Sequence, residues 1–221
     1  MVIAAAPPLL REPVFLERFA MPITPPLQEN DAERVAALQK YAILDTEPEQ
    51  AFDDLVLLAS YICGTPIALI SLVDENRQWF KSKIGLPVSE TPRDIAFCNL
   101  AIQQPNLFIV PDTMEDARFR DNPLVRNDPK IRFYAGAPLI NSDGYALGTI
   151  CIIDSQPRVM DRKQEGALTA LSRLVLGQME FRRNLILLKQ ALNDRSKLEH
   201  EREREIRKLQ ETLLRTVGLR P

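Results

Sequence analysis

Residues 131–153 read IRFYAGAPLINSDGYALGTICII, and this stretch decides the fold that the sequence predicts. Two apolar runs of strand length, 131–140 and 145–153, lie on either side of Asn141-Ser142-Asp143-Gly144. Asn, Asp and Gly are typical of tight turns, because they tolerate backbone angles that other residues avoid. The stretch therefore predicts an antiparallel β-hairpin.

A second pair of strands is predicted upstream of this hairpin. Residues 67–73 are an apolar run of strand length bounded by turn residues, and residues 78–84 follow after Asp74-Glu75-Asn76. A link this short cannot carry the crossover that parallel strands need, so the two strands must be antiparallel. A further short strand is predicted over residues 107–110.

Helices are predicted between these strands. Asp31 is expected to cap the first, and Thr46-Glu47-Pro48-Glu49 has the spacing of a capping box before the second. The second helix is expected to bury Phe52, Leu55, Leu58 and Ala59, and a third is expected over residues 93–103. The sequence therefore predicts the α+β class, with a central antiparallel sheet flanked by helices.

The chain divides into three parts. Residues 1–30 contain six of the seventeen prolines and are expected to form a disordered leader. Residues 31–165 carry the strand and helix signals of a folded domain. Residues 166–221 contain no proline before Pro221 and are expected to form a long C-terminal helix.

Apolar residues recur in this helix at alternating spacings of three and four. Beyond about Arg183 the helix outreaches a domain of this size at about 1.5 Å per residue, and its flanks are rich in charged residues. We expect it to form a coiled-coil homodimer. The alternative is an amphipathic helix packed on its own sheet, which suits the first few turns. A polar stretch over residues 195–202 interrupts the row of apolar residues that would form the coiled-coil seam. The predicted seam residues are Phe181, Leu185, Leu188, Leu192, Ile206, Leu209 and Leu213.

The composition argues against several classes of function. The single histidine, His200, lies in a charged run, whereas a Ser-His-Asp or Cys-His site needs a histidine beside its nucleophile in a cleft. No CxxC pair is present for a zinc site. A net charge of −2 gives no general attraction for nucleic acid. We therefore expect no enzyme active site, no metal and no nucleic-acid partner.

The cellular compartment is also predicted from composition. Cys63, Cys98 and Cys151 are too few and too scattered for a disulfide framework, which indicates a reducing compartment. No run of 18 apolar residues exists, so no membrane span is expected. The start of the chain is a poor signal peptide. The expected location is the cytoplasm.

Several blocks, in order over residues 33–154, resemble the GAF domain of bacterial and cyanobacterial signalling proteins. They include Glu33-Arg34-Val35-Ala36-Ala37-Leu38, Leu44-Asp45-Thr46-Glu47-Pro48, Gln78-Trp79-Phe80-Lys81-Ser82, Val110-Pro111-Asp112, Asp116-Ala117-Arg118-Phe119 and Leu147-Gly148-Thr149. The resemblance implies an antiparallel sheet with helices on one face and a small-molecule pocket under loops on the other. Members of this family typically have a regulatory role. They bind a small ligand or dimerise, and they transmit a signal through flanking helices to an output domain.

The resemblance thus implies a sensory domain that binds a small ligand or dimerises, and signals through its C-terminal helix to an output-domain partner. The cofactor is unknown. Covalent bilin is disfavoured because Asn99, and no histidine, follows Cys98; haem is disfavoured because the domain lacks histidine; and the signature for cyclic nucleotides is missing. The alternative is a ligand-free dimeric scaffold. A cysteine-based methionine sulfoxide reductase and a photoreceptor rank lower.

The same resemblance places a pocket between the sheet, the 93–103 helix and the loop 111–130. Its candidate residues are Trp79, Phe97, Cys98, Asp112, Arg118, Phe119, Arg132 and Tyr134. The alternative is that these residues have structural roles. The aromatic residues would belong to the core, and Asp112 would cap a turn. The arginines would form ion pairs, Arg118 with Asp121 or Arg132 with Asp116. Cys98 is expected to be a small buried hydrophobe, with a redox role as the alternative.

Overall fold

The structure, a computed structural model, describes residues 30–216. Residues 1–29 of the predicted leader and the last five residues of the predicted helix lie outside this range. Within it the chain folds around one six-stranded sheet with the spatial order β3-β2-β1-β6-β5-β4, in which every neighbouring pair is antiparallel. The strands are β1 (Ile67–Val73), β2 (Arg77–Ile84), β3 (Glu90–Pro92), β4 (Phe108–Val110), β5 (Phe133–Ile140) and β6 (Ala146–Asp154).

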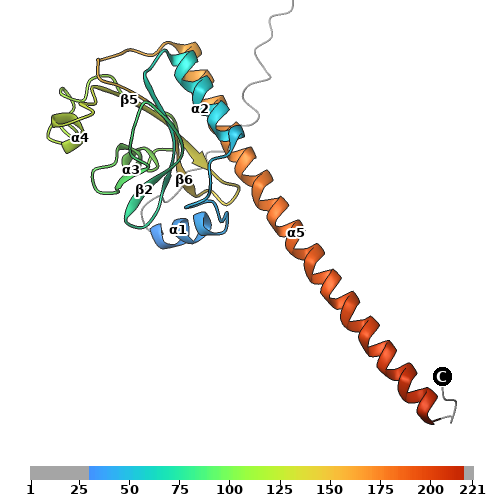
Figure 1. The fold of residues 1–221 in the computed structure, drawn as a ribbon. Coiled ribbons are helices and arrows are strands. Elements are labelled where there is room, and N and C mark those ends of the chain that lie inside the picture. Colours follow the sequence, from blue (N-terminus) through green and yellow to red (C-terminus); the bar gives the residue numbers. More distant parts are fainter. Residues whose placement is uncertain (1–29, 217–221) are drawn as a thin grey trace, which may run out of the picture.

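The helices cover both faces of this sheet (Figure 1). They are α1 (Asp31–Gln39), α2 (Gln50–Cys63), α3 (Phe97–Ala101), α4 (Pro123–Arg126) and α5 (Arg162–Thr216). On one face α2 packs beside the first turns of α5, and on the other lie α3, α4 and the loops around them. The predicted α+β class, with its antiparallel sheet and long C-terminal helix, is confirmed.

Each face of the sheet has its own core because side chains alternate along a strand. On β1, Ile70 and Leu72 pack towards α2 and α5, whereas Leu69 and Val73 pack towards α3. All seven residues of β1 are buried, which explains why this strand is an uninterrupted apolar run in the sequence.

Two local predictions about helix α2 were wrong. The hydroxyl of Thr46 does not cap it but donates to the carbonyl of Ile43, and the helix begins at Gln50. Leu58 is exposed; the buried face instead contains Phe52, Val56, Ala59 and Cys63, whose spacing of four, three and four residues follows one side of an α-helix.

The first and third helices also differ from prediction. Asp31 is the first residue of α1 rather than its cap, which is Asn30, and its carboxylate pairs with arginines instead. Helix α3 covers only 97–101 of the predicted 93–103, because Arg93 and the residues after it form a turn closed by a bond from Ala96 N–H to Arg93 O. Strand β3 and helix α4 were not predicted, since elements this short show no periodicity.

Helix α5 begins in the core of the domain and continues beyond it. Asp161 caps it by accepting hydrogen bonds from the N–H groups of Lys163 and Gln164, both at 2.8 Å. Leu168, Leu171, Val175 and Met179 in its first turns belong to the core. The rest of the helix projects from the domain into solvent, as Figure 1 shows. In this chain every predicted seam residue, from Phe181 to Leu213, is exposed.

No helix among the described residues has the length and apolar character that a bilayer span requires.

Candidate functional site

A cavity of about 350 Å³ lies on the α3 face of the sheet. Strands β1, β2, β5 and β6 form its floor with Leu69, Phe80, Tyr134 and Ile153. Helix α3 contributes Phe97 and Cys98 to one wall, and the segments 86–91 and 124–131 form the rest. Its size is at the lower end of the range for small-molecule sites.

Three of the eight predicted pocket residues, Phe97, Cys98 and Tyr134, line this cavity. Phe119 lies behind the wall, where its ring stacks on that of Phe97 with centroids 4.2 Å apart and planes 5° apart. Trp79 faces the opposite side of the sheet and belongs to the core under α2 and α5. Because side chains alternate along β2, Gln78 and Phe80 face the cavity in its place.

The three charged candidates form ion pairs outside the cavity. Arg132 binds both carboxylate oxygens of Asp112 at 2.9 and 2.6 Å, and Arg118 binds Asp116 in the same way. The predicted partners were therefore wrong. Asp112 follows β4 and Arg132 precedes β5, and the pairing of these two strands brings the side chains together. Asp112 also accepts a bond from the N–H of Met114, which confirms its predicted role in the turn.

Cys98, in the cavity wall, lies beside Cys151 of β6, with 3.8 Å between their sulfurs. The hydroxyls of Tyr134 and Thr149 donate to Cys98 Sγ at 3.2 and 3.1 Å. Burial raises the pKa of the Cys98 thiol, but the hydrogen bonds that Cys98 makes with Cys151, Thr149 and Tyr134 outweigh burial and lower the pKa. The bond to Cys98, together with burial, raises the pKa of Cys151. Cys98 is thus buried, as expected, but in polar surroundings.

Two buried polar atoms in the cavity wall have no hydrogen-bond partner among the described residues: Gln78 Oε1 and Thr91 Oγ1. Gln78 and Thr91 are directly opposite one another in the β2–β3 pair. Neither residue was predicted from the sequence. Most buried polar atoms in proteins are hydrogen-bonded, so these two atoms leave room for a bound water or another polar group in the cavity wall.

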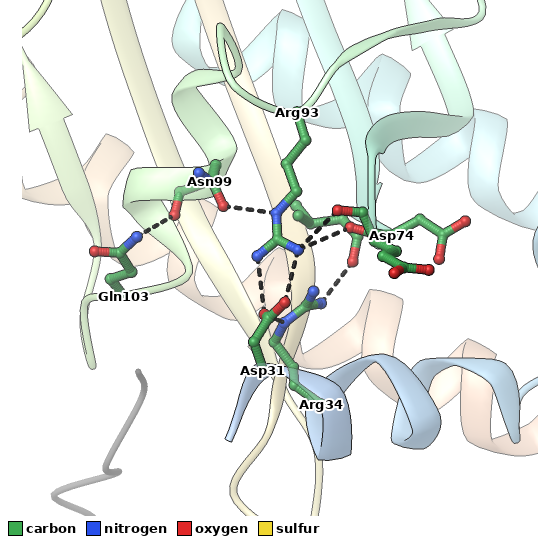
Figure 2. Close-up of polar contacts among 8 residues, drawn as sticks. Asp31, Arg34, Asp74, Arg93, Asn99 and Gln103 are labelled. Atoms are coloured by element: carbon green, nitrogen blue, oxygen red, sulfur yellow. Dashed lines mark hydrogen bonds and ion pairs between the residues drawn. The ribbon is translucent and has the colours of Figure 1, made fainter. Parts of the chain in front are cut away.

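A cluster around Arg93 ties the wall of the cavity to helix α1 (Figure 2). Arg93 binds Asp31 at 2.7 and 2.8 Å, the Asn99 side chain of α3 at 2.9 Å, and the carbonyl of Asp74 at 3.1 Å. Arg34 Nε donates to Asp31 Oδ1 at 2.7 Å, and this oxygen also accepts a bond from Arg93. The hydrogen bond from Arg93 holds the pKa of Asp31 well below its usual range, although partial burial opposes the shift. The cluster fixes the turn that leads into α3.

A second polar group, the Lys81 network, lies on the other face of β2. Lys81 Nζ donates to Thr46 Oγ1 at 2.9 Å, to the Glu47 carbonyl at 2.7 Å and to Glu49 Oε1 at 2.7 Å. The same Glu49 oxygen accepts a bond from Arg182 of α5 at 2.8 Å. Arg182 also binds the Tyr41 and Ala42 carbonyls, at 3.1 and 2.8 Å. The network therefore joins a cavity strand to α5 where the helix leaves the domain.

Among the described residues, no group of three or more His, Cys, Asp or Glu side chains is placed to hold a metal ion. His200 lies exposed on α5 and contacts the carbonyl of Ser196 one turn earlier.

Comparison with known proteins places the chain in a family. The family model described as GAF domain matches residues 47–178, which is more than half of the chain. A relative from Pseudomonas aeruginosa, the cyclic di-GMP phosphodiesterase PA2567, is 40% identical over 162 residues. That alignment covers 73% of this chain and 28% of the relative, so the chain spans less than a third of that protein.

Solved structures agree on the fold. The GAF domain of an Acinetobacter phosphoenolpyruvate-protein phosphotransferase superimposes with a TM-score of 0.52 at 16% identity, over 68% of this chain and 93% of that one. A free methionine-R-sulfoxide reductase from Neisseria meningitidis gives a TM-score of 0.51 at 17% identity, over 70% and 92% of the two chains. At such identity the likeness concerns the fold alone. The matched family model, the sheet and the cavity together identify this chain as a member of the GAF domain family.

Proposed function

We propose that the chain is a regulatory sensory domain that binds a small ligand in the α3-face cavity and signals through α5. One observation carries the proposal: β2 contributes Gln78 and Phe80 to the cavity and, from its other face, Lys81 to the network that holds α5. A ligand that shifts β2 would therefore change the contacts of α5 at its exit from the domain. We propose that the activity regulated by this domain lies in a partner protein or a further domain. The Pseudomonas relative, which is named as a phosphodiesterase, suggests this arrangement.

We further propose that the chain forms a homodimer through α5. The exposed seam runs from Phe181, which is 57% exposed, to Leu213, which is 68% exposed. Leu57, Leu58 and Tyr61 of α2 are also exposed, and α2 packs beside α5. Exposed apolar residues at heptad spacing on a projecting helix are typical of a coiled coil, because a second helix buries them. We propose no catalysis within this domain and a reducing, cytoplasmic location, consistent with three buried free thiols.

Native mass spectrometry of the full chain purified from its own host, compared with its denatured mass, tests both parts. Two matched pairs of variants assign the signals. Val88→Trp fills the cavity mouth, whereas Val159→Trp changes an exposed valine elsewhere. Leu188→Lys places a charge in the seam, whereas Leu187→Lys places it on an exposed leucine outside the seam.

The expected result is a dimer with an added mass. Val88→Trp should remove the added mass, Leu188→Lys should give monomer, and the two control variants should leave both properties unchanged. A ligand-free dimer would favour the alternative, a dimeric scaffold. A monomeric wild-type chain would contradict the coiled coil.

A further inference from the structure

We propose that the cavity binds a small, flat, largely apolar molecule that carries one N–H or O–H donor and no negative charge. This inference rests on the proposed function, in which the cavity is the ligand site, and it specifies the chemistry of the ligand.

The volume limits the size of the molecule. About 350 Å³ accommodates about a dozen water-sized groups at about 30 Å³ each. A one-ring or two-ring compound satisfies this limit, whereas a dinucleotide, haem or tetrapyrrole is far larger than the cavity.

The lining explains why the molecule should be apolar and flat. Leu69, Phe80 and Ile153 cover the floor with hydrocarbon, so apolar surface placed there is removed from water. On the wall, the Phe97 ring is fixed from behind by its stack on Phe119. The Tyr134 ring lies 5.2 Å from that of Phe97 at an angle of 30°. Aromatic rings in a cavity lining favour contact with another ring, either stacked or edge to face.

The unpartnered atoms specify the polar group. Gln78 is 5% exposed, and its Oε1 accepts no hydrogen bond from any described residue. Within residues 30–216, Thr91 Oγ1, opposite on β3, lacks a partner as well. A buried acceptor without a donor costs free energy that a bound N–H or O–H would recover. The ligand should therefore place its donor at the Gln78 end of the cavity.

The charges exclude anions. Asp128 is the only charged side chain in the lining formed by the described residues. Arg93, on the turn before α3, is committed to Asp31 and does not line the cavity. A phosphate or carboxylate would enter an apolar site without a counter-charge, which is strongly unfavourable.

Three probes of nearly equal shape test the class on the full chain by isothermal titration calorimetry. Indole carries the N–H donor, benzofuran replaces it with an oxygen that cannot donate, and indole-3-carboxylate adds a negative charge. Indole should bind about tenfold more tightly than benzofuran, as a hydrogen bond to an otherwise unpartnered buried acceptor implies. Indole-3-carboxylate should bind at least tenfold more weakly than indole.

Matched variants locate the effect. Gln78→Leu should remove the preference for indole over benzofuran while benzofuran still binds, and Thr91→Val tests the neighbouring atom without a change in shape. Gln156→Leu alters an exposed glutamine outside the lining and should leave all affinities unchanged.

Benzofuran binding as tightly as indole, a preference that survives in Gln78→Leu, or tightest binding of the carboxylate would each overturn the inference. Two further outcomes separate it from the proposed function. If no probe binds but the native chain carries an added mass that Val88→Trp removes, the ligand class is wrong and the function stands. If no probe binds and the native chain carries no added mass, both the ligand class and the proposed function are wrong.

Discussion

Lys81 offers the sharpest test of how the domain is held together. Its side chain is fully buried, and three oxygens surround its ammonium group at 2.7 to 2.9 Å. The ammonium also lies 5.3 Å from the centre of the Phe52 ring. Lys81→Met keeps most of the apolar length of the side chain and removes the charge together with all three hydrogen bonds.

The expected cost follows from these contacts. A hydrogen bond that involves a charged group contributes about 1.5–3 kcal/mol, and breaking a buried ion pair costs about 3–5 kcal/mol. Two features reduce the loss: Glu49 keeps its bond to Arg182, and its side chain is 35% exposed, so it is not left as an isolated buried charge. We expect Lys81→Met to lower the free energy of unfolding by about 2–3 kcal/mol.

Urea denaturation of the full chain at one fixed protein concentration measures this change. Fluorescence of Trp79, the single tryptophan and a core residue, reports on the folded domain. Lys83→Met is the matched control: it lies on the same strand and also bonds two carbonyls, but at the surface, and should cost less than about 0.5 kcal/mol. A Lys81→Met variant no less stable than Lys83→Met would refute the reasoning.

Three other outcomes are expected. Because the folded-state pKa of Asp31 is lowered, its contribution to stability is complete above about pH 4 and is lost as the pH falls below that value; urea midpoints between pH 6 and pH 3 should show this, and Asp31→Asn should flatten the decline. Gly148→Ala places a Cβ 2.0 Å from the Ser71 carbonyl oxygen and should cost at least about 1–3 kcal/mol in the same unfolding assay, whereas Gly166→Ala, on open helix surface, should stabilise by about 0.5–1 kcal/mol. Free methionine sulfoxide supplied with a dithiol should stay unreduced; turnover that Cys98→Ser abolishes would count against a purely sensory domain.

The sequence was most informative where structure is local. Two predicted strand pairs are present, with ends within two residues of those predicted: 67–73 with 78–84, and 131–140 with 145–153. They were predictable because hydrophobic alternation and turn chemistry are properties of neighbouring residues. The helices were less well bounded. Residues 93–96 carry no strong helix breaker apart from the proline before them, and it is the tertiary bonds of Arg93 that hold them in a turn.

The cavity was only partly predictable. Of the aromatic candidates, Phe97 and Tyr134 line the cavity. Alternation alone does not say which face of the sheet the odd-numbered residues of a strand occupy, and Trp79 lies on the opposite face. Gln78 and Lys81 were missed as functional positions for a related reason. The surroundings of each depend on segments far away in the sequence. Gln78 lies opposite β3, and Lys81 bonds to the loop before α2.

The length of α5 beyond the core has a mechanical consequence. Met179 is the last residue of the helix that belongs to the core, and the helix continues to Thr216. At about 1.5 Å per residue this part of the helix is about 55 Å long. A tilt of about 6° at the domain would displace its far end by about 6 Å, roughly the pitch of one helical turn. If the helix moved as one rigid body, an ångström-scale shift of Arg182 against Glu49 would therefore become a displacement of several ångströms at its far end.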